Sequence, residues 1–164
     1  MVPVISIVGR SDTGKTTLIE KLVPELKRRG YRVGTIKHDA HQFEIDVPGK
    51  DSWRHRQAGS DATAISSADK LAIIWRVEGE KSLDEVAAYM QDVDIILTEG
   101  YKRSHKPKVE VHRAERGGEL LCNDDELVAV ATDEPVNTQA PCFDINDAKG
   151  LVDLLEARFL KPKA

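Results

Sequence analysis

Residues 4–18, VISIVGRSDTGKTTL, place a strand, a glycine-containing loop and a helix next to one another. Residues 4–8 are an apolar run rich in β-branched side chains, which is typical of a buried parallel strand. Residues 9–16 fit the pattern G-x-x-x-x-G-K-[ST] at every fixed position, and Leu18, Leu22 and Leu26 then recur at helical spacing. This order predicts an α/β fold in which the loop joins a parallel strand to a helix.

The loop predicts a binding site for the phosphates of a nucleoside triphosphate. Its glycines allow several backbone N–H groups to converge on a phosphate, and the helix N-terminus adds positive potential. Lys15 can reach the β- and γ-phosphates, and the Thr16 hydroxyl can bind Mg²⁺. An ordinary glycine-rich turn is the structural alternative, but the flanking strand and helix favour the phosphate site. The residues expected to contact the nucleotide are Gly9, Arg10, Ser11, Asp12, Thr13, Gly14, Lys15, Thr16 and Thr17.

The remaining pattern predicts a mostly parallel sheet flanked by helices, the P-loop NTPase fold. Further buried strands are expected at residues 33–37, 93–100 and 127–131, and a half-exposed one at 108–112. Two strand-like runs within residues 62–77 predict an antiparallel β-hairpin extension. By length the chain is expected to form a single domain over residues 1–160, followed by a tail at 161–164.

Composition limits the classes of partner. The 164 residues are 40% hydrophobic and 32% charged, with a net charge of −4, which gives no general attraction to nucleic acid or membranes. The two cysteines have no CxxC spacing and predict neither a metal site nor a disulfide framework, and Cys142 is expected in the core. A core strand directly after Met1 and the absence of a long apolar run predict a cytoplasmic protein.

Glu99 is the second candidate catalytic residue, beside Lys15. It ends the strand expected at residues 93–100, where a P-loop protein needs a carboxylate to hold Mg²⁺ or polarise the attacking water. Asp94 is an alternative, although it stands at the opposite end of the strand. A surface glutamate at a strand end is the structural alternative.

The polar segment after residue 37 supplies further candidate metal ligands. Asp39 and Asp46 could complete the Mg²⁺ shell, while His38 and His41 together with these acids could instead hold Zn²⁺ or Ni²⁺. A solvated loop with one capping aspartate explains the same residues without any ligand.

A basic run follows Glu99 directly. Lys102, Arg103, Lys106 and Lys108 could bind an anionic ligand or a partner beside the nucleotide, although such a run is often only a solvated loop. The guanine-reading pattern N-K-x-D is absent. Asp133 follows a buried strand at the expected position of a base-reading loop, and its carboxylate could accept the N1 and N2 hydrogens of guanine.

Several of these segments together resemble the MobB family of molybdopterin-guanine dinucleotide biosynthesis adaptors. They are the loop GRSDTGKTTL, TIKHDAH, the D-x-x-G-K-D-S-x-R run within residues 46–59, TEGYK and the strand PKVEV. The resemblance extends over nearly the whole chain in the right order. The D-x-x-G-K-D-S-x-R run and TEGYK are more distinctive than the P-loop.

The resemblance implies a GTP- and Mg²⁺-binding protein with weak GTPase activity. It also implies that the protein works with a molybdopterin guanylyltransferase and contacts molybdopterin or its phosphate. The resemblance further implies a homodimer joined through the hairpin. By position, Gly14, Lys15, Thr16 and Thr17 would hold phosphate and Mg²⁺, and Glu99 with Lys102 would lie at the active edge. Arg10 replaces the lysine that related MinD-like ATPases carry early in the P-loop. A small-molecule kinase and a metallochaperone GTPase are the alternative functions.

Overall fold

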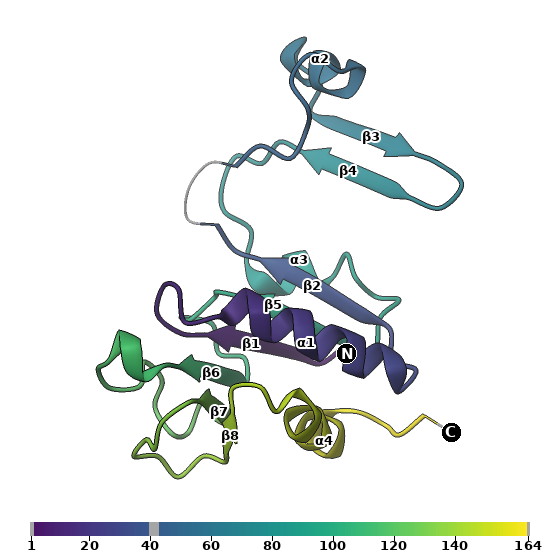
Figure 1. Ribbon diagram of the computed structural model, residues 1–164. Helices are drawn as coiled ribbons and strands as arrows, with labels where there is room; N and C mark the ends of the chain where they lie inside the picture. The colour runs from purple at the N-terminus through teal and green to yellow at the C-terminus, as the bar shows by residue number, and fades with distance from the viewer. Residues whose placement is uncertain (1, 40–42, 164) are drawn as a thin grey trace. The chain divides into compact units, whose positions relative to one another are not determined.

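The computed structural model describes residues 2–39 and 43–163, which divide into two compact units (Figure 1). One unit contains residues 1–38 and 83–164, and the other contains residues 39–82. Each unit has its own sheet, and the single domain expected over residues 1–160 stays a prediction. Within the described residues, no helix is both long and apolar enough to cross a membrane.

A six-stranded parallel sheet in the order β2-β5-β1-β6-β7-β8 forms the larger unit. Its strands are β1 (Val4–Val8), β2 (Val33–Lys37), β5 (Ile95–Glu99), β6 (Lys108–His112), β7 (Leu127–Thr132) and β8 (Cys142–Asp144). Its helices are α1 (Lys15–Arg28), α3 (Leu83–Ala87) and α4 (Ala148–Phe159), with a 3-10 turn η1 (Ala114–Arg116). This arrangement confirms the predicted α/β fold.

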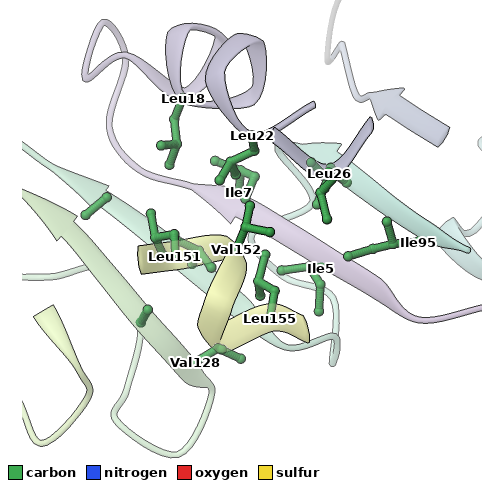
Figure 2. Close-up of a cluster of buried hydrophobic side chains, with 14 of the residues drawn as sticks. Ile5, Ile7, Leu18, Leu22, Leu26, Ile95, Val128, Leu151, Val152 and Leu155 are labelled. Carbon is green, nitrogen blue, oxygen red and sulfur yellow. The ribbon is translucent and has the colours of Figure 1, made fainter. Parts of the chain in front are cut away.

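Helices α1 and α4 supply the main core against one face of the sheet. Their apolar side chains converge on β1 (Figure 2). Leu22 is fully buried, and burying one such side chain stabilises the fold by about 2 kcal/mol. The residues that meet here include Leu18, Leu22, Leu26, Leu151, Val152, Leu155, Ile5 and Ile7. The helical spacing of the leucines in α1 therefore predicted the buried face correctly.

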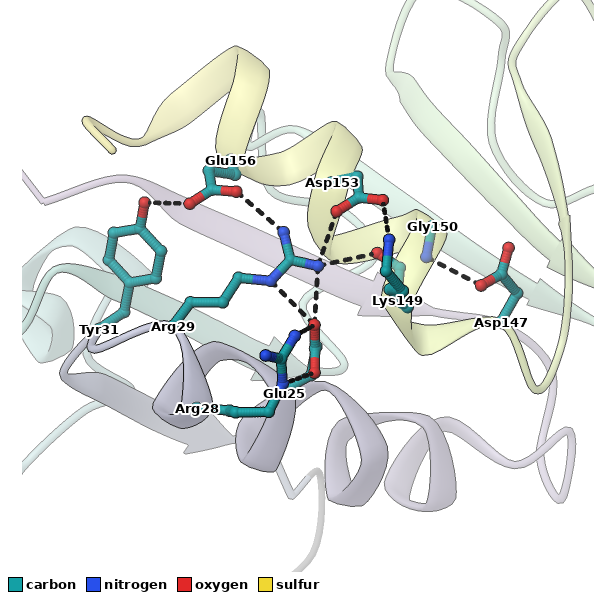
Figure 3. A network of polar contacts seen from close by, with 9 residues as sticks. All are labelled: Glu25, Arg28, Arg29, Tyr31, Asp147, Lys149, Gly150, Asp153 and Glu156. Carbon is teal, nitrogen blue, oxygen red and sulfur yellow. Dashed lines mark hydrogen bonds and ion pairs between the residues drawn. The ribbon is translucent and has the colours of Figure 1, made fainter. Parts of the chain in front are cut away.

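An ion-pair network also joins α1 to α4 (Figure 3). The Arg29 guanidinium contacts Glu25 and Asp153 at 2.7 Å and Glu156 at 2.8 Å. The hydroxyl of Tyr31 donates to Glu156 at 2.6 Å. Burial raises the pKa of Tyr31 to about 12, and the hydrogen bond to the Glu156 carboxylate acts in the same direction. The C-terminal end of α1 is thus held to α4 by charge as well as by packing.

Two predictions about burial are wrong. The strand β6 is buried along its whole length, and its polar side chains are paired: Lys108 with Glu126, and Glu110 with the Leu121 N–H. A buried charged side chain is tolerated when it is paired in this way. Cys142 is exposed on the edge strand β8, not in the core.

The second unit contains α2 (Asp51–Gln57) and a two-stranded antiparallel sheet of β3 (Ala62–Ser66) and β4 (Leu71–Trp75). This confirms the predicted hairpin. Register places Leu71, Ile73 and Trp75 on one face of the sheet, where their exposed fractions are 64%, 44% and 49%. The unit therefore presents a large apolar surface.

Candidate phosphate-binding site

The loop from β1 to α1 has the backbone conformation that its glycines predict. Gly9 has φ 151°, and a Cβ there would lie 2.5 Å from the Val111 carbonyl oxygen. Gly14 has φ 94° and is the residue before the first turn of α1. A side chain at Gly9 would collide with the neighbouring strand, so the loop can approach β6 this closely only with glycine there.

The loop is closed around the carbonyl oxygen of Arg10. The Thr13 hydroxyl donates to this oxygen at 3.0 Å, and the Lys15 ammonium donates to it at 2.7 Å. Thr13 is buried, whereas Thr16 and Thr17 are exposed at the start of α1. The ammonium of Lys15 therefore lies against the loop whose N–H groups are expected to bind phosphate.

Glu99 is brought to the loop by strand order. Because β5 pairs with β1, Glu99 lies beside Ile7, and its carboxylate reaches the helix start. The Thr16 hydroxyl is 2.9 Å from both carboxylate oxygens. A hydroxyl and a carboxylate are the hard oxygen ligands that Mg²⁺ takes, usually together with waters and substrate phosphates. These two residues fit a Mg²⁺ ion, whereas Asp94 accepts the Arg32 N–H at the opposite end of β5.

The ends of β2 and β5 meet beside Glu99. The His38 N–H donates to the Glu99 carbonyl at 3.0 Å, and the His38 and Tyr101 rings lie 4.7 Å apart. Tyr101 has φ 54°, which is uncommon for a residue with a side chain. This strained turn directly after Glu99 was not predicted from the sequence.

Asp133 lies on the other side of the loop, after β7. Its carboxylate accepts the Ala114 N–H at 2.9 Å and is 3.6 Å from the Arg113 guanidinium. Arg113 in turn donates from Nε to the Thr13 carbonyl at 2.9 Å. Arg113 was not predicted from the sequence, because only the order of the strands reveals that β6 ends beside the P-loop.

Comparisons with known proteins identify the family of the chain. A family model described as "Molybdopterin guanine dinucleotide synthesis protein B" matches residues 4–133, which include the P-loop, Glu99 and Asp133. The chain belongs to the MobB family.

Relatives named molybdopterin-guanine dinucleotide biosynthesis adapter protein extend the match beyond that range. The Escherichia coli protein is 39% identical over 161 residues, covering 94% of this chain and 92% of its own. The Haemophilus influenzae protein is 38% identical over 157 residues, covering 94% and 88%. A solved MobB structure is 32% identical with a TM-score of 0.73 and covers 94% of this chain and 97% of its own. A MobB homolog from Bacillus stearothermophilus is 29% identical with a TM-score of 0.69, covering 94% and 99%.

The basic run of this MobB family member is divided between the two ends of the parallel strands. Lys102 and Arg103 are exposed directly after the site. Lys106 instead contacts Asp84 at 2.5 Å and lines a hollow with Val2, which precedes β1. The ion pair favours a structural role for Lys106, and its predicted contact with a partner or pterin stays a prediction.

Lys108 is also excluded from the exposed basic surface. Its side chain is fully buried, and its ammonium donates to the Glu126 carboxylate at 2.6 Å and to the Ser104 carbonyl at 2.7 Å. This burial argues against contact of Lys108 with a partner or pterin, which was predicted from the sequence and stays a prediction.

The other candidate ligands belong to the second unit or lie outside the described residues. Asp46 accepts the Ser52 hydroxyl at 2.9 Å and lies 3.6 Å from the Arg56 guanidinium, which favours a structural role within residues 39–82. Asp39 and Asp46 as Mg²⁺ ligands stay predictions, and His41 lies outside the described residues. Among the residues that are described, no group of three or more His, Cys, Asp or Glu side chains could hold a metal ion.

Proposed function

We propose that this MobB family member binds GTP with Mg²⁺ at the P-loop, hydrolyses it slowly, and acts as an adaptor for the guanylyltransferase that makes molybdopterin guanine dinucleotide. The contact of Thr16 with Glu99 carries the proposal, because it joins the P-loop to the acid that such a site requires. The names of the relatives supply the pathway.

Each residue of the site has a proposed task. The loop N–H groups and the Lys15 ammonium hold the β- and γ-phosphates. Thr16 and Glu99 would hold Mg²⁺, which would offset the negative charge of the phosphates. Glu99 also orients the water that attacks the γ-phosphate. Asp133 stands at the edge of the site where guanine is expected, with one carboxylate oxygen already accepting the Ala114 N–H.

We also propose a homodimer built on the second unit. An isolated two-stranded sheet is at best marginally stable in water. The face that carries Leu71, Ile73 and Trp75 is exposed, and the hairpin has unpaired strand edges in the described chain. Pairing with a second copy would bury this surface.

The adaptor proposal is tested with the two basic residues that remain beside the site. Lys102 and Arg103 are exposed and follow Glu99, so they could meet a phosphorylated pterin or the transferase that carries it. The assay measures the guanylylated cofactor that purified transferase forms with and without this protein. Replacing both residues by Glu should abolish the stimulation by this protein and leave its GTP binding unchanged. The screening length of about 8 Å at physiological salt keeps the effect local.

The matched control reverses two exposed charges elsewhere, Lys27→Glu on α1 with Arg158→Glu on α4, and should stimulate like the parent. If the double variant at Lys102 and Arg103 stimulates as well as the parent, the basic segment is only a solvated loop. If the parent gives no stimulation at any salt concentration, the adaptor proposal fails.

A further inference from the structure

Arg113 packs directly against the phosphate-binding loop. It is the first residue after β6, the strand that pairs with β1. Its Nε donates to the Thr13 carbonyl at 2.9 Å, and its guanidinium lies 3.4 Å from the position that a Cβ of Gly14 would occupy. The guanidinium therefore binds Thr13 and lies next to the space beside Gly14.

Asp133 fixes the position of Arg113 from the neighbouring strand. One of its carboxylate oxygens accepts the Ala114 N–H at 2.9 Å, and the other lies 3.6 Å from Nη1 of Arg113. Both side chains are about two-thirds buried, at 31% and 34% exposure. The loop after β7 is thus connected to the P-loop through one arginine.

The same segment contacts the P-loop at two further points. Arg116 lies 3.7 Å from the Asp12 carboxylate, and the Arg10 guanidinium donates to the Glu119 carbonyl at 3.3 Å. These contacts show that residues 113–119 run along the P-loop, and that the Arg113 contact is part of a continuous surface.

The contact with Thr13 controls the direction of an N–H group. The Thr13–Gly14 peptide is trans, so its C=O and N–H point in opposite directions. A donor that holds the carbonyl therefore aims the Gly14 N–H to the opposite side, and P-loops bind phosphate through such N–H groups. A neutral or shorter side chain at residue 113 would hold this carbonyl less firmly.

We propose that Arg113, held by Asp133, is a positioning residue that orients the P-loop for phosphate binding. The inference rests on the proposed binding of a nucleoside triphosphate. It places the action of Arg113 on the phosphate side of the nucleotide, so the effect does not depend on which base is bound.

The test compares Arg113→Gln, Arg113→Lys and the control Arg158→Gln, an exposed arginine on α4. Titration calorimetry with Mg²⁺ measures binding of GTP, ATP and inorganic tripolyphosphate, which has no base. A hydrogen bond to a charged group is worth enough to change affinity about tenfold. Arg113→Gln should weaken all three ligands by about that factor, Arg113→Lys should recover part of the loss, and Arg158→Gln should bind like the parent.

Asp133→Asn provides the second measurement. If Asp133 acts through Arg113, this substitution weakens tripolyphosphate as well as both nucleotides, and in the Arg113→Gln background it adds little to the loss of tripolyphosphate binding. A direct contact of Asp133 with guanine would add a further loss for GTP alone. Thermal unfolding monitors the fold, and Arg113→Lys, which keeps the charge, carries the test if the Gln variant does not fold.

Two results would overturn the inference. The first is parent-like tripolyphosphate binding by a folded Arg113 variant. The second is a loss confined to GTP, which would make Arg113 or Asp133 a contact of the base. A parent that binds none of the three ligands would instead refute the proposed nucleotide site itself, and the inference with it.

Discussion

The buried ion pair of Lys108 and Glu126 predicts an asymmetric response to substitution. Lys108 is fully buried, whereas the Glu126 side chain is 35% exposed. Lys108→Met keeps most of the packed stem and leaves a carboxylate that water can reach, so we expect a loss of stability of about 1 kcal/mol or less. Glu126→Gln leaves the buried ammonium with neutral acceptors only, so we expect a loss of about 3 kcal/mol.

Urea unfolding followed by far-UV circular dichroism measures the two losses. Both tryptophans, Trp53 and Trp75, lie in residues 39–82, so their fluorescence reports the second unit and not the sheet that contains Lys108. Glu20→Gln, an exposed position on α1, is the matched control and should have almost no effect. A larger loss for Lys108→Met than for Glu126→Gln would refute the reasoning from burial.

The pair also predicts the sign of a pH effect. The hydrogen bond from Lys108 lowers the pKa of Glu126 from its ordinary value of 4.5. A carboxyl whose folded pKa is lowered stabilises the fold above its unfolded pKa and loses that contribution as the pH falls through the folded pKa. In Lys108→Met the part of acid destabilisation that is due to Glu126 should therefore be smaller, and an unchanged acid profile would contradict this assignment.

Three further outcomes test the site, the assembly and the link between α1 and α4. Glu99→Gln should leave GTP binding largely intact and slow hydrolysis; equal turnover in single-turnover assays would move the role to another acid. Ile73→Lys should give monomers in sedimentation, because a charge on the exposed hairpin face opposes its burial, and a variant that remains dimeric at micromolar concentration would place the interface elsewhere. Stability should fall as the pH rises from about 10 to about 12, since the raised pKa of Tyr31 makes the unfolded chain lose its proton first; an identical alkaline profile for Tyr31→Phe would exclude Tyr31 as the cause.

Local sequence patterns predicted much of the fold and pointed to the residues of the candidate site. Residues 4–18 fixed the strand, loop and helix, and the requirement of a P-loop for an acid pointed to Glu99. The structure places Glu99 beside Ile7 and in contact with Thr16. The fold prediction succeeded because it depends on neighbours in the chain, whereas the role of Glu99 stays a prediction that its contact with Thr16 supports.

The errors concern interactions between segments distant in sequence. A lysine is rarely buried unless it is paired, so Lys108 was expected to be exposed. Its partner Glu126 is distant in sequence, and the sequence pattern does not show that the two residues meet. Arg113 became a candidate only when strand order placed β6 between β1 and β7. The role of Arg113 therefore needs the tertiary structure, whereas the roles of Lys15 and Glu99 can be proposed without it.

Titration of the parent and Lys15→Ala with GTP and Mg²⁺ tests the central claim most directly. The Lys15 ammonium lies against the loop, at 2.7 Å from the Arg10 carbonyl, where a charge-assisted contact with phosphate is expected. We expect the parent to bind GTP and Lys15→Ala to bind at least about tenfold more weakly, a loss of about 1.4 kcal/mol, while Lys27→Ala on the same helix binds like the parent. Equal affinity in a folded Lys15→Ala variant would contradict the assignment of this loop as the phosphate-binding site.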